Sequence, residues 1–328
     1  MKAKVLQLLR ENEDYVSGQQ LCEKLGVSRT AVWKAINGLR DAGYEIEALT
    51  NRGYRLVDAP TDLLTASEVA SWLQTQEIGS KICYKDEIDS TNNWAKELAQ
   101  KDYPSGTVCL ADMQSKGKGR RGRSWESPAG SSLYFTVMLR PDILPAQASP
   151  LTLVMGLSVA QSLKKYPGLD AKIKWPNDIV VNGKKVCGIL TEMSAQIDYL
   201  EYLVIGTGVN VNRMEFPEEL QATATSLQIE TGEKQSRARL AAEILNCFEK
   251  NYKTFLKSGD LAGLQEDYNE LLVNKDREVR VLTPGNEYTG LALGINNKGE
   301  LLVQKEDGSQ EAVYAGEVSV RGIYGYTL

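Results

Sequence analysis

The feature that most constrains this chain is a short segment from Gln114 to Trp125, with the sequence Gln-Ser-Lys-Gly-Lys-Gly-Arg-Arg-Gly-Arg-Ser-Trp. It combines three glycines with five cations: Gly117, Gly119 and Gly122, and Lys116, Lys118, Arg120, Arg121 and Arg123. Glycine lets the backbone approach a ligand closely, and crowded cations repel one another until an anion binds between them. We therefore expect a loop that is mobile alone and ordered by a polyanion or an activated phosphate. A solvated basic loop is the alternative for a charge run by itself.

The segment also satisfies the pattern Gly-x-Gly-x-x-Gly, which in a dinucleotide site is followed at once by a helix that receives the pyrophosphate. Here Gly122 is followed by Arg-Ser-Trp-Glu-Ser-Pro128 and then by a strand-like run, Ser132 to Leu139. The sequence therefore argues against a Rossmann site. It also lacks Gly-x-x-x-x-Gly-Lys-Ser/Thr, so any ATP is bound without a P-loop.

Histidine is absent from all 328 residues. Ser-His and Cys-His nucleophiles, histidine metal sites and imidazole acid-base catalysis are therefore excluded, and an enzyme must use binding, charge stabilisation, and lysine, arginine or carboxylate groups. The five cysteines include no Cys-x-x-Cys pair, which favours reduced buried thiols. The net charge of −5 leaves nucleic-acid binding only to a local basic face.

Length and hydropathy predict a soluble cytoplasmic protein of two or three domains. A hydrophobic content of 42% is enough for ordinary cores. No run of about eighteen apolar residues occurs, and the first residues are too charged for a signal peptide, so no membrane association is expected.

Residues 1 to about 60 have the pattern of a winged helix-turn-helix. Ser17 begins a capping box, Gly26 stops the helix that follows it, and Ser28 caps the next helix. The expected elements are helices over 2–12, 17–25 and 28–41 and strands over 44–49 and 53–57.

In such a domain the third helix enters the major groove and the wing touches the DNA backbone or minor groove. The expected DNA-binding residues are Ser28, Arg29, Thr30, Lys34 and Arg52. A small protein-interaction module is the alternative, and Trp33 fits either the core or a contact.

The central part of the chain alternates helices and strands. A linker is expected over 58–62, then a helix from the Thr65 capping box to about Gln76 and a strand over 81–87. A helix capped by Asp89 or Ser90 comes next. The remaining expected elements are strands over 107–113 and 132–139, a buried helix over 149–165, a strand over 202–212 and an amphipathic helix over 237–256.

Asn182-Gly183 is the strongest hairpin signal in the chain. A two-residue turn there places Val180 opposite Lys185, and alternation then puts Asp178 and Lys185 on one face. Gly206 and Gly208 interrupt the strand over 202–212, which indicates either a close approach to its backbone or a bulge. From about Glu278 onward, short alternating strands predict a small barrel.

Five motifs taken together resemble the biotin-protein ligases, and the N-terminal winged helix resembles the bifunctional bacterial type that also represses the biotin operon. They occur in family order along essentially the whole chain: Asp89-Ser-Thr-Asn92, Gln114 with Gly117–Arg123, Lys174-Trp-Pro-Asn-Asp178, Gly183–Leu190 and Gly206-Thr-Gly-Val-Asn210.

The resemblance implies that biotin and ATP, with Mg²⁺, give biotinyl-5'-adenylate and pyrophosphate. Biotin then passes to a lysine of the biotin carboxyl carrier protein of acetyl-CoA carboxylase or of a related carboxylase. No prosthetic group is implied. Fixed cations can stabilise the charge that develops on the α-phosphate, so histidine is not needed.

The resemblance also assigns residues. Lys185 and Arg120 are the expected catalytic residues, and Asp178 is an expected magnesium ligand or orienting group. Biotin is assigned to Ser90, Thr91, Asn92, Gln114, Gly117, Arg120, Lys185, Gly206 and Gly208. The nucleotide is assigned to Lys118, Arg121, Arg123, Trp125, Lys174, Asn177, Asn210 and Arg321. Lys118 departs from the arginine of some members, which keeps the charge but loses planar bidentate contacts.

The predicted fold class is α+β, with a winged helix-turn-helix over 1–60, a class II synthetase-like α/β catalytic domain over 61–272 and an SH3-like barrel over 273–328. The resemblance further implies operator DNA as a partner and a homodimer when the adenylate is bound. Two alternatives stay open. One is a lipoate-type ligase on the same fold, and the other is a regulator that only senses a small effector.

Overall fold

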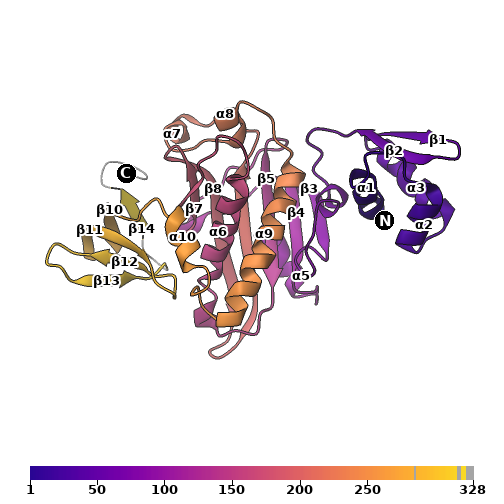
Figure 1. The fold of residues 1–328 in the computed structure, drawn as a ribbon. Coiled ribbons are helices and arrows are strands. Elements are labelled where there is room, and N and C mark those ends of the chain that lie inside the picture. The colour runs from indigo at the N-terminus through magenta and orange to yellow at the C-terminus, as the bar shows by residue number, and fades with distance from the viewer. Residues whose placement is uncertain (284–285, 316–318, 323–328) are drawn as a thin grey trace. The chain divides into compact units, whose positions relative to one another are not determined.

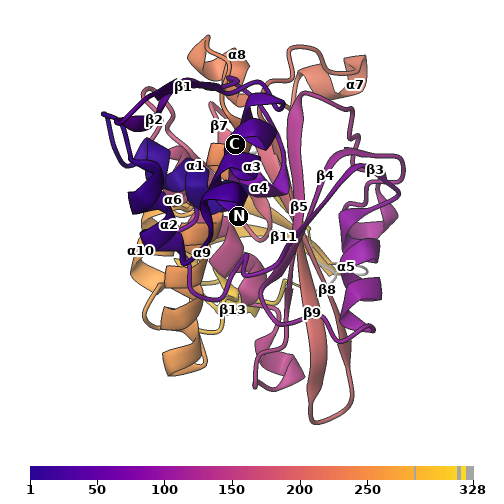
Figure 2. The same cartoon turned by 90° about the vertical axis from the view of Figure 1, so that its right-hand side faces the viewer.

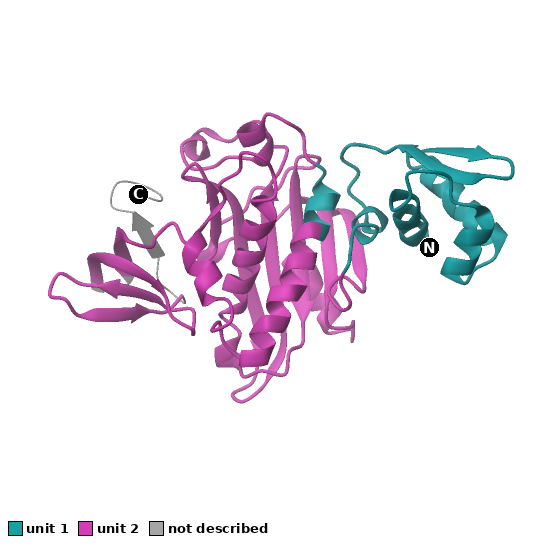
Figure 3. Ribbon diagram, in the orientation of Figure 1, with its two compact units in different colours: residues 1–74, 236–242 teal, residues 75–235, 243–328 magenta. Residues whose placement is uncertain are grey.

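The structure, a computed structural model, describes residues 1–283, 286–315 and 319–322, of which 283, 286 and 319–322 are described by their backbone alone. The chain divides into two compact units, shown in Figure 3. Unit 1 comprises Met1–Gln74 and Ser236–Ala242, and unit 2 comprises Thr75–Gln235 and Glu243–Leu328. The domain boundaries at residues 60 and 272 stay predictions.

Unit 1 begins with the predicted helix-turn-helix and hairpin. Ser17 and Gln20 form the expected capping box, Gly26 ends its helix in the left-handed region at φ 65°, and Ser28 Oγ accepts from the backbone N–H of Ala31. The elements are α1 (Lys2–Arg10), α2 (Gly18–Leu25), α3 (Arg29–Arg40), β1 (Glu45–Leu49) and β2 (Gly53–Asp58). Their shared core includes Val5, Leu6, Leu9, Leu21, Val32, Ile36, Leu39 and Ile46.

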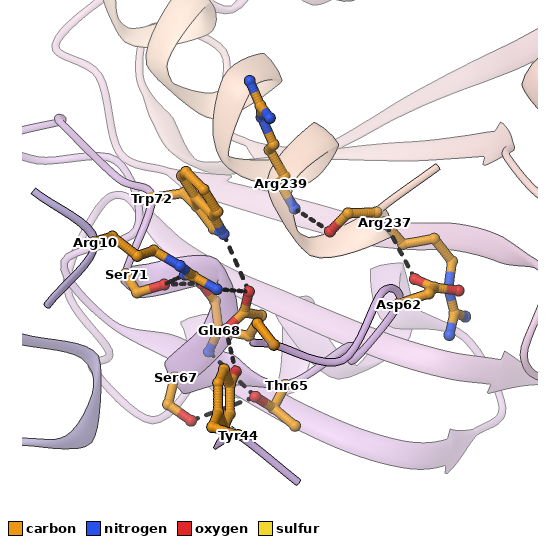
Figure 4. Close-up of polar contacts among 12 residues, drawn as sticks. Arg10, Tyr44, Asp62, Thr65, Ser67, Glu68, Ser71, Trp72, Arg237 and Arg239 are labelled. Atoms are coloured by element: carbon orange, nitrogen blue, oxygen red, sulfur yellow. Dashed lines mark hydrogen bonds and ion pairs between the residues drawn. The ribbon is translucent and has the colours of Figure 1, made fainter. Parts of the chain in front are cut away.

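The helix predicted to run to Gln76 is wrong, because α4 spans only Ala66–Ala70. Thr65 caps it as expected, but Glu68 does not return to the cap as the capping box requires. Its carboxylate instead accepts hydrogen bonds from Arg10 (2.6 Å), from Trp72 Nε1 (3.1 Å) and from the Tyr44 hydroxyl, as Figure 4 shows. Burial, followed by the Glu68 contact, raises the pKa of Tyr44. Two long-range donors, together with Trp72 four residues away, therefore outweigh a local cap.

A buried ion pair joins the linker to the start of α9 (Arg237–Ser258), whose first residues belong to unit 1. Arg237 Nε lies 2.9 Å from Asp62 Oδ2, and the two side chains are 5% and 2% exposed (Figure 4). The stretch predicted as a plain linker therefore carries a structural carboxylate. Such a pair is costly to break, because removing one partner leaves a buried charge uncompensated.

Unit 2 is built on a seven-stranded mixed sheet in the order β3-β4-β5-β9-β8-β7-β6. Only β3 and β4 run parallel, and the other neighbours pair antiparallel. All eight residues of β5 are buried, as expected for a strand covered on both faces. The strands are β3 (Ile82–Ile88), β4 (Thr107–Gln114), β5 (Ser132–Leu139), β6 (Lys172–Lys174), β7 (Asp178–Val181), β8 (Lys184–Ala195) and β9 (Leu200–Asn210).

Helices cover both faces of this sheet (Figures 1 and 2). α5 (Thr91–Ala99) packs on β4, β5 and β9 from one side, while α6 (Leu151–Leu163) packs on β6, β7 and β8 from the other. α6 is apolar nearly all round because it lies between the sheet and α9 and α10 (Gln265–Leu271). Two short helices, α7 (Glu218–Gln221) and α8 (Leu227–Thr231), were not predicted.

The C-terminal strands form a five-stranded antiparallel sheet in the order β13-β12-β11-β10-β14. Closure into a barrel stays a prediction. Trp175, fully buried, donates from Nε1 to the carbonyl of Gly299 (3.1 Å), and Asn269 Oδ1 accepts from Ile295 N–H (2.7 Å). The strands are β10 (Arg277–Thr283), β11 (Asn286–Ile295), β12 (Leu301–Gln304), β13 (Gln310–Val313) and β14 (Ser319–Gly322).

Among the described residues, no helix has both the length and the apolar character that a membrane span needs. The five cysteines are free, and Cys109 and Cys187 are buried.

Glu249 of α9 receives three backbone N–H groups in unit 2, from Gln76, Glu77 and Ile78, at 2.8 to 3.1 Å, and an ion pair from Lys253 at 2.9 Å. Burial raises the pKa of Glu249, but these donors outweigh it and lower the pKa to about 2. The carboxylate thus accepts the hydrogen bonds of three consecutive backbone N–H groups in the segment before β3.

We expect Glu249→Gln to destabilise the protein by about 2 kcal/mol at pH 7, less than the full pKa shift implies because nearby solvent screens the carboxylate. The folded pKa lies below the unfolded one, so this stability is present above about pH 4.5 and is lost as the pH falls toward 2. Urea unfolding followed by circular dichroism at pH 7, 5 and 4 measures the difference. Glu97→Gln, at an exposed position of α5, is the control, and a gap that does not narrow with acid contradicts the assignment.

Candidate active site

A pocket opens in unit 2 where the start of α5 meets the basic loop and strands β8 and β9. The predicted site residues that line it are Ser90, Thr91, Asn92, Gln114, Lys118, Arg120, Trp125, Asn177, Lys185, Gly206 and Gly208. Gly119, Gly188, Ile189, Leu190 and Thr207 complete the lining. The sequence assigned no ligand to these five. Their only signal was membership of the motif segments.

One end of the pocket is polar, because α5 begins there. Gln114 Oε1 accepts from the backbone N–H of Thr91 (2.9 Å), and Gln114 Nε2 donates to Ser127 Oγ (2.9 Å). Ser90 is the N-cap residue but makes no side-chain cap bond, and Asp89 instead accepts from Ser90 N–H (2.6 Å) and from Asn93 Nδ2 (2.6 Å). Burial raises the pKa of Asp89, but these two donors, together with Lys118 and Lys116, lower it overall. The hydroxyl of Ser90 therefore does not serve the helix.

The floor of the pocket is β9, at the two glycines that interrupt it. A Cβ at Gly206 would lie 2.1 Å from Asn92 Oδ1, and one at Gly208 would lie 2.6 Å from Trp125 Nε1. The pairing of β9 with β5 and β8 stays regular through both glycines. Close approach therefore explains Gly206 and Gly208, and the bulge interpretation is wrong.

Another part of the pocket lining is cationic. Lys185 Nζ lies 2.6 Å from Asp178 Oδ1 and 5.1 Å from the centre of the Trp125 ring. Arg120 donates to Asn177 Oδ1 (3.0 Å) and to the carbonyl of Ala315 (2.6 Å). Burial lowers the pKa of Arg120, and Asp178 opposes this shift. Lys118, with Nζ 2.7 Å from Asn93 Oδ1, adds a third cation to the lining.

The hairpin between β7 and β8 places Lys185 on this cationic edge. Asn182 and Gly183 both have positive φ, 49° and 75°, and Val180 pairs with Lys185 as predicted. A register shift between Ile179 and Val180 then sets Asp178 opposite Gly188. The Lys185–Asp178 contact survives this irregularity because the lysine side chain is long.

The basic loop closes on itself beside the pocket. Trp125 N–H donates to the carbonyl of Gly117 (2.9 Å), and a Cβ at Gly117 would lie 2.3 Å from Trp125 O. Gly117 thus permits the closure that brings Trp125 over β9. The chain continues as extended backbone at Arg123, so no helix follows Gly122. This agrees with the prediction that the segment is not a Rossmann site.

Seven predicted site residues do not line the pocket. Lys174 is buried in β6, and Asn210 donates to the carbonyl of Thr225 (3.0 Å). Gly117 and Asp178 lie directly behind lining residues, and Arg121 and Arg123 are exposed on the loop. Arg321 is described only by its position in β14, so its side chain lies outside the described residues.

In unit 1 the predicted DNA-binding residues of α3 lie on one exposed face. Arg29, Thr30 and Lys34 are exposed, and Trp33 is 56% exposed, so Trp33 does not belong to the core. Arg52 at the hairpin turn lies 3.2 Å from Asp14 and stacks over Tyr15 at 4.7 Å. The wing arginine is therefore held against the α1–α2 connection.

Three family models match this chain. Residues 84–210 match the biotin/lipoate A/B protein ligase family, residues 2–55 match an HTH domain, and residues 276–321 match the biotin protein ligase C-terminal domain. Fold, pocket and matches together define a ligase with a helix-turn-helix domain.

The chain belongs to the bifunctional ligase/repressor family of biotin protein ligases. It is 41% identical to the bifunctional ligase/repressor BirA of Bacillus subtilis over 94% of both chains, and 33% identical to that of Escherichia coli over 95% of both. A solved biotin protein ligase from Aquifex aeolicus, in complex with biotin and ATP, superposes with a TM-score of 0.65 at 33% identity. It covers 74% of this chain and 99% of its own.

We expect Gly206→Ala to destabilise the protein by about 1–3 kcal/mol, because the new methyl group must displace Asn92 from a packed floor. Urea unfolding of the full-length chain, followed by circular dichroism, measures the loss of stability. Gly119→Ala is the matched control, since a Cβ there finds its nearest neighbour at 3.4 Å and the backbone has φ −115°. Equal stability of the two variants would contradict the close-approach interpretation of Gly206.

Proposed function

We propose that this chain is a biotin protein ligase that forms biotinyl-5'-adenylate and transfers biotin to a carrier protein, and that it also represses transcription. The observation that carries the proposal is the pocket itself. A polar end at Thr91 and Gln114, a glycine floor and a cationic edge with Arg120 and Lys185 suit an acid that meets a nucleotide phosphate.

In the first step a carboxylate oxygen of biotin attacks the α-phosphorus of ATP. A new P–O bond forms, the bond to the β-phosphate oxygen breaks, and pyrophosphate leaves. Lys185 and Arg120 supply positive charge where the α-phosphate oxygens gain negative charge. Asp178, 2.6 Å from Lys185, fixes the direction of the ammonium group before substrate arrives.

In the second step the neutral amine of a carrier lysine attacks the acyl carbon of the adenylate. A C–N bond forms, the C–O bond to the phosphate breaks, AMP leaves, and the amine loses one proton to solvent. The acyl group is already activated, so the protein must orient the amine and exclude water. Trp125 and the closed basic loop cover the floor of the pocket and serve this purpose.

Magnesium fits this site as a companion of ATP. The described ranges hold no group of three Cys, Asp or Glu side chains arranged as metal ligands, and Asp178 is one carboxylate already paired with Lys185. Mg²⁺ commonly binds through one or two carboxylates and substrate phosphates. We therefore assign most of its ligands to ATP and water, with Asp178 as the protein carboxylate nearby. Magnesium supplies charge neutralisation on the phosphates.

The exposed face of α3 supports operator DNA as a second partner. Arg29, Thr30 and Lys34 present donors and charge on one side of a helix whose other side is core. We further propose that the adenylate promotes a homodimer that presents two such helices to a two-fold operator. The carrier is the biotin carboxyl carrier protein of acetyl-CoA carboxylase or a related carboxylase, and the protein works in the cytoplasm, where ATP and DNA are available.

Lys185→Ala is expected to lower kcat for biotin-dependent exchange of labelled pyrophosphate into ATP by about 100- to 1000-fold, because a fixed cation is lost from the developing charge. The neighbouring Lys184→Ala is the matched control and is expected to keep near-normal exchange. Lipoate replaces biotin in a parallel assay. Exchange with lipoate alone would make the chain a lipoate ligase, and biotin binding without exchange would make it a sensor.

Arg29→Ala and Lys34→Ala are each expected to weaken DNA binding and to reduce the slope of log affinity against log salt by about 1 when a phosphate contact is lost. Fluorescence anisotropy at several salt concentrations measures both, with biotin and ATP present. The probe is a duplex selected from a random library by the unmutated chain. Lys101→Ala, exposed in unit 2, is the control, and unchanged binding by both α3 variants would contradict this assignment.

A further inference from the structure

A half-buried carboxylate outside the predicted site lies directly behind the polar end of the pocket. Glu192 of β8 accepts from Asn92 Nδ2 (2.8 Å) and forms an ion pair with Lys96 Nζ (2.9 Å). Both partners of this pair are 28% exposed, so the contact is only partly screened by solvent. Neither Glu192 nor Lys96 lines the pocket or belongs to the motifs of the sequence.

Glu192 fixes which way the Asn92 amide points. A carboxylate can only accept, and the carbonyl of Leu190, 3.2 Å from the same nitrogen, can only accept as well. The NH₂ group must therefore face Glu192 and Leu190, and Oδ1 must face Thr136. Asn92 lines the pocket, but both of its N–H donors are used inside the protein, so its amide does not donate to a ligand.

The orientation of Asn92 passes along two hydroxyl groups. Thr136 Oγ1 lies 2.7 Å from Asn92 Oδ1 and 2.8 Å from Thr91 Oγ1. A hydroxyl has one proton, and Oδ1 cannot donate, so Thr136 donates to Asn92. The hydroxyl of Thr91 lies 2.8 Å from Thr136 Oγ1 and 3.1 Å from Gln114 Oε1, and its one proton takes the shorter contact, to Thr136. Gln114 Oε1 retains the Thr91 backbone N–H at 2.9 Å.

The proton of Thr91 is thereby directed away from the pocket, and its lone pairs are left on the pocket side. We infer that Glu192, held by Lys96, is a positioning residue that sets Thr91 as an acceptor for an N–H donor of the bound acid. This inference rests on the proposed function and deepens it. The cyclic urea of biotin has such N–H groups, whereas the dithiolane ring of lipoate has none. This series of hydrogen bonds from Glu192 to Thr91 thus makes the pocket selective for a ureido ligand.

Steady-state pyrophosphate exchange with the full-length chain tests this inference. Glu192→Ala is expected to raise the KM for biotin about 10-fold while kcat and the KM for ATP stay within about threefold, because the reacting groups are untouched. Glu192→Gln keeps an acceptor oxygen and is expected to stay within about threefold of the parent. Lys96→Met is expected to give a smaller rise than Glu192→Ala. Glu201→Ala, on the adjacent strand and bonded to Ser194, is the matched control.

A second readout separates positioning from general damage. Biotin methylated at one ureido nitrogen cannot donate there, so the parent chain should bind the matching N-methyl compound at least 10-fold more weakly than biotin. In Glu192→Ala this penalty should shrink, because the acceptor is no longer fixed. If Glu192→Ala does not fold, the same comparison is made with Lys96→Met.

The outcomes distinguish this inference from the proposed function. No exchange with biotin by the parent chain would overturn the ligase assignment. Normal exchange by the parent, together with an unchanged biotin KM and an unchanged N-methyl penalty in Glu192→Ala, would overturn the role of Glu192 alone. A fall in kcat together with similar rises in the KM for biotin and the KM for ATP would show that Glu192 has a merely structural role. That result would also overturn the inference.

Discussion

The site depends on the close packing of the start of α5 and of Trp125 against two glycines of β9, Gly206 and Gly208. Asn92 occupies the space that a Cβ at Gly206 would fill, and Trp125 occupies the space above Gly208. Because interiors are close-packed, one added methyl group would move Asn92 and the groups bonded to it. The glycines of β9 are thus the condition for the whole polar end of the pocket.

Charge is organised around that floor in two different ways. On the cationic edge, Asp178 holds Lys185, while Asn177 and the carbonyl of Ala315 hold Arg120, and both cations remain beside the pocket. At the polar end, the carboxylate of Glu192 lies outside the lining and acts through Asn92. The first arrangement stabilises charge that appears during reaction, and the second selects what can bind. A protein without histidine can perform both tasks, since neither needs a group that titrates near neutral pH.

Unit 1 shows a related use of buried carboxylates for structural purposes. Glu68 collects donors from α1 and from the start of the hairpin, and Asp62 binds the first residue of α9 (Figure 4). The helix-turn-helix is therefore joined to the segment that follows it by the Arg10–Glu68 ion pair and the Tyr44–Glu68 hydrogen bond, and the Asp62–Arg237 pair joins that segment to α9. Removing one partner of such a pair costs more than the pair contributes, because the remaining charge stays buried.

The sequence by itself determined the elements whose signals are local. Ser17, Ser28 and Gly26 fixed helix ends, Asn182-Gly183 fixed a hairpin, and the motif order identified most of the pocket lining. Only the tertiary structure decided what depends on residues far apart in the chain. Glu68 does not complete the capping box but accepts from donors 24 and 58 residues away, and Glu192 accepts from Asn92, which is 100 residues away. Local propensity cannot show these contacts, because the competing partners meet only after the sheet and helices have packed.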